Sequence, residues 1–379
     1  MQKITVLHLI PNLLTGGAER LTVDLVNELS QRVDVKLILF YSLDSFPDQH
    51  FLKDLNKDVS VEFLNKKKGF SLKIYFKLFK ILRRDKPAIV HTHLYIFKYI
   101  APFFLLFRGK IKGVHTIHSE ADRESPNLID RILKRFLFKY RLCYPVVISK
   151  GNINSYERIY GNIPFTLIEN GRKVQGPSGE FYRLRERFDA KVKRNGDKIF
   201  LFVGRLEEVK NPELLIYAFD KLRTTNLNAK LVIIGRDTKY FSKANLLELL
   251  TRLKLNQNVV YLGEKNNVYD YMLLSDYLCI CSKMEGMPIS LIEGMSAGLV
   301  PVVTKVGGIP DMVGENGYFA KENTIDSYFD ALKMAASSSN EDLDLKRENL
   351  INEFQVRFDI KICAENYIRL YSEIVKTAN

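Results

Sequence analysis

The chain has 379 residues, of which 46% are hydrophobic and 27% are charged, and its formal net charge is +13. These proportions are typical of a soluble globular protein and exclude a disordered chain, while the length suits two domains of about 150 to 200 residues. The longest uncharged apolar run, Tyr99–Phe107, has nine residues, whereas a membrane-spanning helix needs about 20. We therefore expect no transmembrane segment.

The positive charge is concentrated in the first half of the sequence. Residues 1–170 contain 27 Lys and Arg against 16 Asp and Glu, a net charge of +11. Such asymmetry favours an acidic partner, for which anionic lipid and nucleic acid are the general candidates. The four cysteines show no CxxC spacing, which is typical of a reduced, cytosolic protein. The first residues alternate as a strand and lack the apolar region of a signal peptide.

Short β-branched runs alternate with helical patterns along the whole chain. This alternation predicts an α/β fold with two doubly wound Rossmann-like domains, covering 1–170 and 171–357, that face each other across a cleft. The predicted strands are 3–10, 35–40, 59–64, 88–93, 113–118, 145–149, 199–204, 230–235, 258–262, 277–281 and 300–304.

A glycine pair follows the first predicted strand. Gly16 and Gly17 precede a helix, where they would let the backbone approach a ligand and direct helix-start N–H groups at a phosphate. A purely structural turn is the alternative, because strand-Gly-Gly-helix turns are common without a ligand.

Two predicted helices, 71–84 and 131–141, combine basic and apolar residues. Such helices bind anionic lipid in peripheral proteins, although an apolar side on the core with a solvated basic side gives the same pattern. Nucleic acid is disfavoured because no recognised binding motif accompanies the charge. The predicted membrane contacts are Lys73, Lys77, Lys80, Arg84, Arg131, Lys134 and Arg135.

Histidines end two predicted strands of the first half. His91 and His93 share a strand face and His118 ends the next strand. A metal pair at His91 and His93 is conceivable, but the sequence positions no third ligand, so hydrogen-bonded packing is the preferred interpretation. We predict no metal site and no cofactor, and no nucleophilic triad motif is present.

The second half carries two polar motifs after predicted strands. Arg205 and Lys210 precede a helix predicted at 212–223, with Asn211 as its N-cap. This pair can neutralise a diphosphate without a metal, unless the loop is merely solvated and paired with Glu207 and Glu208. Pro288 is expected in the first turn of a helix that ends before Gly298. Glu285 and Glu293 would then reach one pocket at the mouth of that helix, which favours a phosphate and sugar hydroxyls.

Together these motifs resemble the retaining glycosyltransferases of family 4, which have the two-domain GT-B fold. The resemblance rests on Gly-Gly-Ala-Glu-Arg at 16–20, His-Thr-Ile-His-Ser at 115–119, Val-Gly-Arg-Leu-x-x-x-Lys-Asn-Pro at 203–212 and Glu-x7-Glu at 285–293. It departs at Asn170-Gly171-Arg172-Lys173, where members often have Asn-Gly-Val-Asp. It also implies that residues 358–379 return to the first, acceptor-binding domain, while the second binds the nucleotide sugar.

The resemblance assigns roles to residues in both halves. Arg205 and Lys210 would hold the diphosphate, Glu293 the ribose and Glu285 the donor sugar. Gly17 would approach the phosphates, and His118 would lie near the reacting sugar. The predicted catalytic residues are His118, Glu285, Arg205 and Lys210, and the predicted donor contacts are Gly16, Gly17, Arg205, Lys210, Glu285, Gly286, Met287, Pro288, Ile289 and Glu293.

The implied reaction moves a hexose or its derivative from a UDP- or GDP-sugar to a glycan or lipid-linked acceptor in bacterial surface polysaccharide assembly. It would keep the anomeric configuration, need no metal, and occur at the inner face of the plasma membrane. Glu285 could instead act as a nucleophile, as carboxylates do in retaining glycosidases. The alternatives are a UDP-sugar epimerase of the same fold and a non-catalytic subunit that binds nucleotide sugar or lipid.

Overall fold

The computed structural model describes residues 4–46, 49–192, 196–225 and 227–377, so that Lys3 of the first predicted strand lies outside the described residues. The chain divides into two compact units. Unit 1 combines Met1–Lys173 with Arg357–Asn379, and unit 2 is Val174–Val356.

Unit 1 is built on a parallel sheet whose described strands follow the order β3-β2-β1-β4-β5-β6-β7. The strands are β1 Thr5–Ile10, β2 Asp34–Leu39, β3 Ser60–Phe63, β4 Ile89–His93, β5 Lys112–Ile117, β6 Cys143–Val147 and β7 Thr166–Leu167. The helices are α1 Gly17–Leu29, α2 Leu72–Asp85, α3 Phe97–Leu106, α4 Ala121–Glu124, α5 Leu128–Lys139, α6 Ile153–Tyr160 and α15 Ile360–Lys376.

Unit 2 repeats the scheme with the order β10-β9-β8-β11-β12-β13. Its strands are β8 Lys198–Val203, β9 Ala229–Ile234, β10 Val259–Gly263, β11 Tyr277–Ile280, β12 Val300–Thr304 and β13 Tyr318–Ala320. Its helices are α7 Phe181–Lys191, α8 Pro212–Arg223, α9 Lys243–Arg252, α10 Val268–Leu273, α11 Ile289–Ser296, α12 Ile309–Val313, α13 Ile325–Ala336 and α14 Asn340–Glu353.

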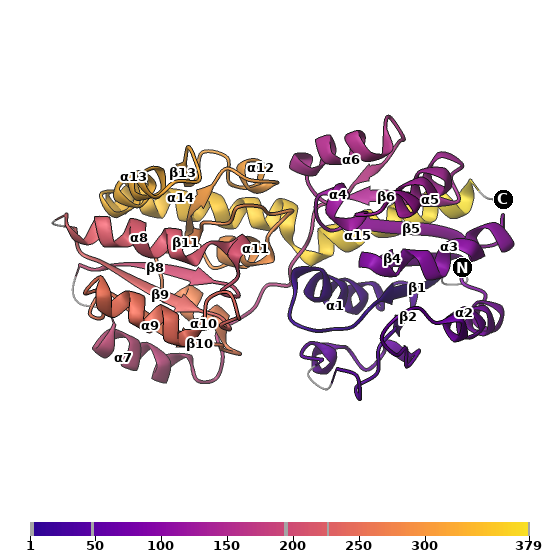
Figure 1. Cartoon of the computed structure of the whole chain (residues 1–379), viewed down its shortest axis with the longest axis horizontal. Coiled ribbons are helices and arrows are strands. Elements are labelled where there is room, and N and C mark those ends of the chain that lie inside the picture. The colour runs from indigo at the N-terminus through magenta and orange to yellow at the C-terminus, as the bar shows by residue number, and fades with distance from the viewer. Residues whose placement is uncertain (1–3, 47–48, 193–195, 226, 378–379) are drawn as a thin grey trace. The chain divides into compact units, whose positions relative to one another are not determined.

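Both sheets are doubly wound, as predicted (Figure 1). The strand order reverses between β1 and β4 in unit 1 and between β8 and β11 in unit 2. Ligands of such sheets bind beyond the carboxyl ends of the strands at this reversal. The loops after β8 and β11 are therefore the first place to look for a site in unit 2.

The last helix, α15, belongs to unit 1 and packs against α1. Arg172 helps to hold it, because the Arg172 backbone N–H donates to the carbonyl oxygen of Phe358 at 2.8 Å and its guanidinium pairs with the carboxylate of Asp24 on α1. Both side chains are buried. The basic residue that departs from the family pattern thus neutralises a buried carboxylate.

Several local predictions are corrected. Pro288 is the N-cap residue of α11 with extended backbone, so the helix begins one residue later, at Ile289. Asn211 is the N-cap of α8, but its side chain makes no capping bond and contacts Asn323 instead. The sequence patterns missed β7 and β13, because strands of two and three residues have too short a pattern. They also missed α7, because the polar segment 171–196, rich in Gly, Arg and Lys, was interpreted as the crossing between the two domains.

One predicted membrane contact on α5, Lys134, is wrong. Lys134 is buried, not available to a membrane, and its ammonium lies 3.0 Å from Asp130 and donates to Ser125 Oγ at 2.9 Å. Because a paired and hydrogen-bonded charge can be buried, Lys134 occupies a core position and apolar residues face outwards. No described helix is long and apolar enough to cross a membrane.

Candidate functional site

The loops at the strand reversal of unit 2 bring together two predicted site residues. Lys210 follows β8 and Glu285 follows β11, and Lys210 Nζ lies 2.6 Å from Glu285 Oε1. Ser282 Oγ donates to the same carboxylate oxygen at 2.6 Å. Both charged side chains are only partly exposed, so the pair is an ordered feature at the expected ligand edge of the sheet.

The Glu285 loop is held in place by Gly307 and Gly308, which follow β12. Gly307 has φ of +54°, and a Cβ there would overlap the Glu285 carbonyl oxygen. The Gly308 N–H donates to the Gly286 carbonyl oxygen at 2.9 Å. Glycine at 307 is therefore required both by its backbone conformation and by the close approach of the Glu285 loop.

Arg205 lies on the β8 loop and is paired locally. Its guanidinium contacts Glu207 at 2.7 Å, and its side chain is 47% exposed. The sequence analysis gave this pairing with Glu207 as the alternative to a diphosphate-binding role. The loop is tied to the loop after β9, since the Leu206 N–H donates to the Arg236 carbonyl oxygen at 2.9 Å.

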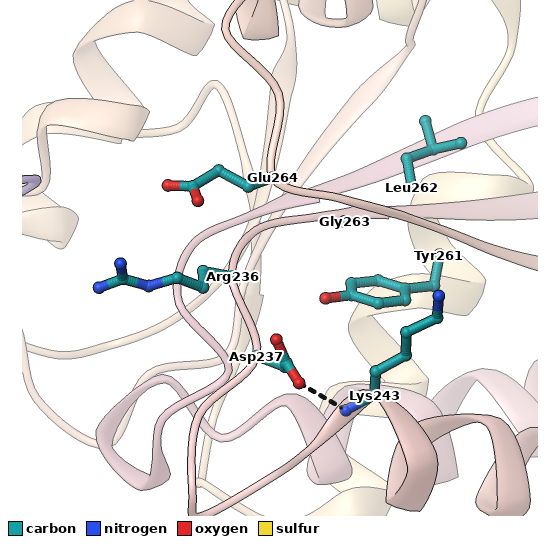
Figure 2. A pocket seen from close by; sticks show the side chains of 7 residues that line it. All are labelled: Arg236, Asp237, Lys243, Tyr261, Leu262, Gly263 and Glu264. Carbon is teal, nitrogen blue, oxygen red and sulfur yellow. Dashed lines mark hydrogen bonds between the residues drawn. The ribbon is translucent and has the colours of Figure 1, made fainter. Parts of the chain in front are cut away.

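A pocket of about 310 Å³ opens at the carboxyl ends of β9 and β10, near the lower end of the usual range of about 300 to 1,000 Å³ for small-molecule sites. Figure 2 shows the Tyr261 ring across the pocket from Arg236 and Glu264, with Asp237 between them. Burial and the carboxylates of Asp237 and Glu264 raise the pKa of Tyr261, whose hydroxyl donates to the Gly235 carbonyl oxygen. The pocket is lined by Arg236, Asp237, Lys243, Tyr261, Leu262, Gly263 and Glu264.

Sequence reasoning missed this pocket. Its residues form no recognised motif, and the available signal was the position of Arg236, Asp237 and Glu264 just after two adjacent parallel strands. The remaining predicted donor contacts lie around α11. Met287 and Ile289 are buried, Gly286 bonds the Gly308 loop, and Glu293 is a partly buried residue in the middle of the helix.

In unit 1 the predicted glycines begin α1. Gly16 is its N-cap residue and Gly17 its first residue. A Cβ at Gly16 would overlap the carboxylate of Glu19, so glycine leaves room for that side chain. Gly17 is exposed.

The histidines of unit 1 form a hydrogen-bonded network, in agreement with the packing role preferred for His91 and His93. The distance between His93 Nδ1 and His118 Nε2 is 2.9 Å, and the distance between His93 Nε2 and His8 Nδ1 is 3.1 Å. His91 bonds Tyr371 of α15 and Thr116 of β5, each at 2.7 Å. His8 escaped notice because it is single in its strand, although β1 and β4 place it directly beside His91.

Burial keeps these imidazoles neutral. It lowers the pKa of His8 to about 3 and of His118 to about 4, and it lowers the pKa of His91 and His93 well below the usual value. Ring nitrogens of His8, His91 and His93 lie within 4.8 Å of one another, a spacing compatible with a metal ion. Both nitrogens of His91 and of His93 already have hydrogen-bond partners, so the chain's own side chains satisfy this cluster.

Comparison with known proteins identifies the protein family to which the chain belongs. The model "Glycosyltransferase Family 4" matches residues 15–174, and "Glycosyl transferases group 1" matches residues 185–353. The UDP-Gal:α-D-GlcNAc-diphosphoundecaprenol α-1,3-galactosyltransferase of Escherichia coli is 25% identical over 98% of both chains.

Solved structures agree on the fold. A glycosyltransferase from Rickettsia africae has a TM-score of 0.80 at 19% identity and covers 99% of this chain and 100% of its own. Anabaena HepE in complex with UDP has a TM-score of 0.79 at 17% identity, covering 98% and 100%. The chain belongs to the family 4 glycosyltransferases with the GT-B fold, and it is a transferase.

Proposed function

We propose that the chain moves a hexose or hexose derivative from a nucleotide diphosphate sugar to the hydroxyl group of a glycan or lipid-linked acceptor, with the anomeric configuration retained. The observation that carries this proposal is the Lys210–Glu285 pair at the strand reversal of unit 2, on loops next to an open pocket. The pathway we propose is assembly of a bacterial surface polysaccharide, as suggested by the name of a Staphylococcus aureus relative, capsular polysaccharide biosynthesis glycosyltransferase CapH, which is 24% identical over 97% of this chain.

The pocket is suited to the nucleoside end of the donor. It offers an aromatic ring at Tyr261 and the carboxylates of Asp237 and Glu264, which can accept hydrogen bonds from ribose or base. The β8 and β9 loops are bonded to each other, so a donor in this pocket would extend its phosphates towards Arg205 and Lys210. Glu293, on α11, is proposed to bind the ribose.

Lys210 is proposed to act on the leaving diphosphate. Its ammonium is balanced by Glu285 without a donor, and phosphate oxygens would add a second set of anionic partners. A fixed positive charge stabilises the negative charge that develops on the leaving group. With Arg205 it supplies this charge from the protein itself, so we propose transfer without a metal ion. Glu285 would then contact the sugar hydroxyls, with the nucleophile role as the alternative.

A lipid-linked acceptor implies contact with the inner face of the cytoplasmic membrane, which we also propose. The roles assigned to Gly16, Gly17 and His118 by family resemblance remain predictions.

Incubation with radiolabelled UDP-galactose separates the candidate activities. The first acceptor to try is diphosphoundecaprenol-linked GlcNAc, which the name of the E. coli relative specifies, and UDP-glucose and GDP-mannose serve as further donors. Label in the lipid product supports transfer, and the coupling constant of its anomeric proton reports retention. An altered sugar nucleotide without acceptor would favour the epimerase. Binding of UDP with no product from any donor would favour the non-catalytic subunit.

A further inference from the structure

The outer face of α5 is apolar on the side directly opposite the core. Ile129, Ile132 and Phe136 follow one another at helical spacing and are 80%, 59% and 44% exposed. The buried side of the same helix carries Leu137, Phe138 and the paired Lys134. Burial of this lysine leaves the stripe of large apolar side chains facing away from unit 1.

The stripe is part of a larger surface. Helix α3 packs against both α2 and α5, and buried residues of all three belong to one core cluster. On the outward sides of this layer, Leu72 and Phe76 of α2 and Leu106 of α3 are also exposed. We call these three residues, with Ile129, Ile132 and Phe136, the outer apolar surface. Exposed apolar side chains grouped on neighbouring helices mark an interaction site.

Basic side chains are concentrated in the same segment of the chain. Residues 70–140 contain 15 Lys and Arg against 5 Asp and Glu, a net +10 of the chain's +13. Lys73, Lys77 and Lys80 are exposed on α2 beside Leu72 and Phe76, and Arg135 and Lys139 are exposed on α5. The acidic residue of α5, Asp130, is paired with Lys134 on its inner side.

We propose that the outer apolar surface binds an anionic lipid bilayer, with the α5 stripe inserted at the boundary between headgroups and acyl chains. The lysines of α2 would lie against the headgroups. Apolar insertion combined with attraction of Lys and Arg to anionic lipid is how interfacial helices bind membranes. The inference deepens the proposed function, because it identifies the surface that would bring unit 1 to a lipid-linked acceptor.

Charge and apolar exposure together favour an anionic bilayer over a second copy of the chain or nucleic acid as the partner of the outer apolar surface. A second copy using the same surface would place two strongly positive faces together, which is unfavourable. Nucleic acid would match the charge but leave the apolar stripe exposed to water. An anionic bilayer satisfies both the charge and the apolar side chains.

A single tryptophan tests insertion directly, because the chain contains none. The Phe136→Trp variant should show a blue-shifted emission when vesicles of equal phosphatidylglycerol and phosphatidylcholine are added. The matched control is Met334→Trp, at a residue of α13 in unit 2 that is 62% exposed, and its emission should not move. The absence of a shift for Phe136→Trp, or an equal shift in the control, would overturn the proposal. So would a blue shift that grows with protein concentration without vesicles, which would indicate self-association.

Vesicle sedimentation then separates the two contributions. Ile129→Ser with Ile132→Ser should weaken binding at least tenfold, and Lys73→Gln with Lys80→Gln should weaken it by roughly fivefold per charge. Met334→Ser and the pair Lys239→Gln and Lys321→Gln, all at exposed positions of unit 2, should change nothing. Salt at 500 mM should reduce the contribution of the lysines and spare that of the apolar residues.

Thermal stabilisation by UDP, measured in every variant, keeps this inference separate from the proposed function. If the variants of the outer apolar surface are stabilised by UDP and still bind vesicles as the unmodified chain does, the proposed membrane contact is wrong and the proposed function is unaffected. Intact vesicle binding by a chain that no nucleotide stabilises would leave the surface standing and remove the proposed function.

Discussion

Lys210 is the residue on which the proposed transfer most depends, because its ammonium is the ordered cation at the strand reversal of unit 2. Lys210→Met should lower the transfer rate by about a hundredfold, since removal of one group that stabilises transition-state charge has this effect. The fold should be unchanged, because Lys210 is partly exposed. The measurement is turnover with labelled donor, beside circular dichroism.

Lys283→Met provides the matched control. Lys283 lies on the same loop as Glu285, is exposed, and pairs with Glu208 at 3.0 Å. It should retain activity within about threefold, because exposed ion pairs contribute little. Equal losses in the two variants would mean that general positive charge, rather than Lys210, assists the reaction.

The sequence located part of this site and missed the rest for physical reasons. Lys210 and Glu285 could be predicted to meet because each follows a strand, and adjacent parallel strands end at one edge. Tyr261 and His8 could not, since their roles depend on which strands are neighbours and in what register. Strand order and register are set by packing across the whole sheet.

At the scale of elements, the loop containing Gly307 controls the Glu285 loop. In Gly307→Ala the new methyl group would overlap the Glu285 carbonyl oxygen, so the Glu285 loop must move. We expect UDP to bind at least tenfold more weakly. A thermal-shift titration would show this as a higher UDP concentration at the midpoint of stabilisation. Gly314→Ala is the control, because Gly314 has the same φ of +54° but nothing within 4 Å of the added carbon. If Gly314→Ala weakened UDP binding equally, backbone strain rather than the contact with the Glu285 loop would explain the effect of Gly307→Ala.

The contact of α15 with the rest of unit 1 gives another element-scale prediction. Arg172→Met should destabilise unit 1 by about 3 kcal/mol, because loss of one partner leaves the buried Asp24 with less compensation. Arg32→Met removes an exposed pair between the loop after α1 and Glu365 of α15 and should cost less than about 1 kcal/mol. Urea unfolding followed by circular dichroism measures both. Similar values for the two variants would contradict a special role for the buried pair.

Most elements could be predicted because their patterns are long. The strand at 277–281 and the helix at 212–223 correspond closely to β11 and α8. Lys134 was wrongly predicted to be an exposed membrane contact. The pattern of α5 did not decide its orientation, since Ile129, Ile132 and Phe136 fit a core-facing stripe as well as an exposed one. What decided it was the neighbourhood of Lys134, where Asp130 and Ser125 make burial of a charge acceptable.

At the scale of the whole molecule, histidine is unevenly distributed. All six histidines belong to unit 1, and five of them, His8, His91, His93, His115 and His118, have a pKa lowered chiefly by burial. The groups that face them include Glu124 and Lys134 as well as Tyr367 and Tyr371. Unit 2 has no histidine to titrate between pH 7 and 5.

Acid should therefore unfold unit 1 first. A histidine with a lowered folded-state pKa contributes full stability above pH 6.5, and that stability is lost as pH falls from 6.5 towards the folded value, about 3 for His8 and about 4 for His118. Together, His8 and His118 reduce the free energy of unfolding by about 3 kcal/mol for each pH unit below 6.5. At pH 4.5 the loss is about 5 kcal/mol, which is comparable to the whole free energy of unfolding of a typical domain, about 5 to 15 kcal/mol.

Tryptophan emission can follow the two units separately. Thermal unfolding of Phe136→Trp reports unit 1 and that of Met334→Trp reports unit 2, because the chain has no other tryptophan. Between pH 7.5 and 5.0 the first midpoint should fall steeply and the second only slightly, since most carboxylates titrate below pH 5. His50→Gln, which alters the histidine outside the network, should leave the first slope unchanged, whereas His118→Asn should make it shallower because one buried proton site is gone. Parallel decline of both midpoints would instead assign the acid sensitivity to charge repulsion across the whole chain.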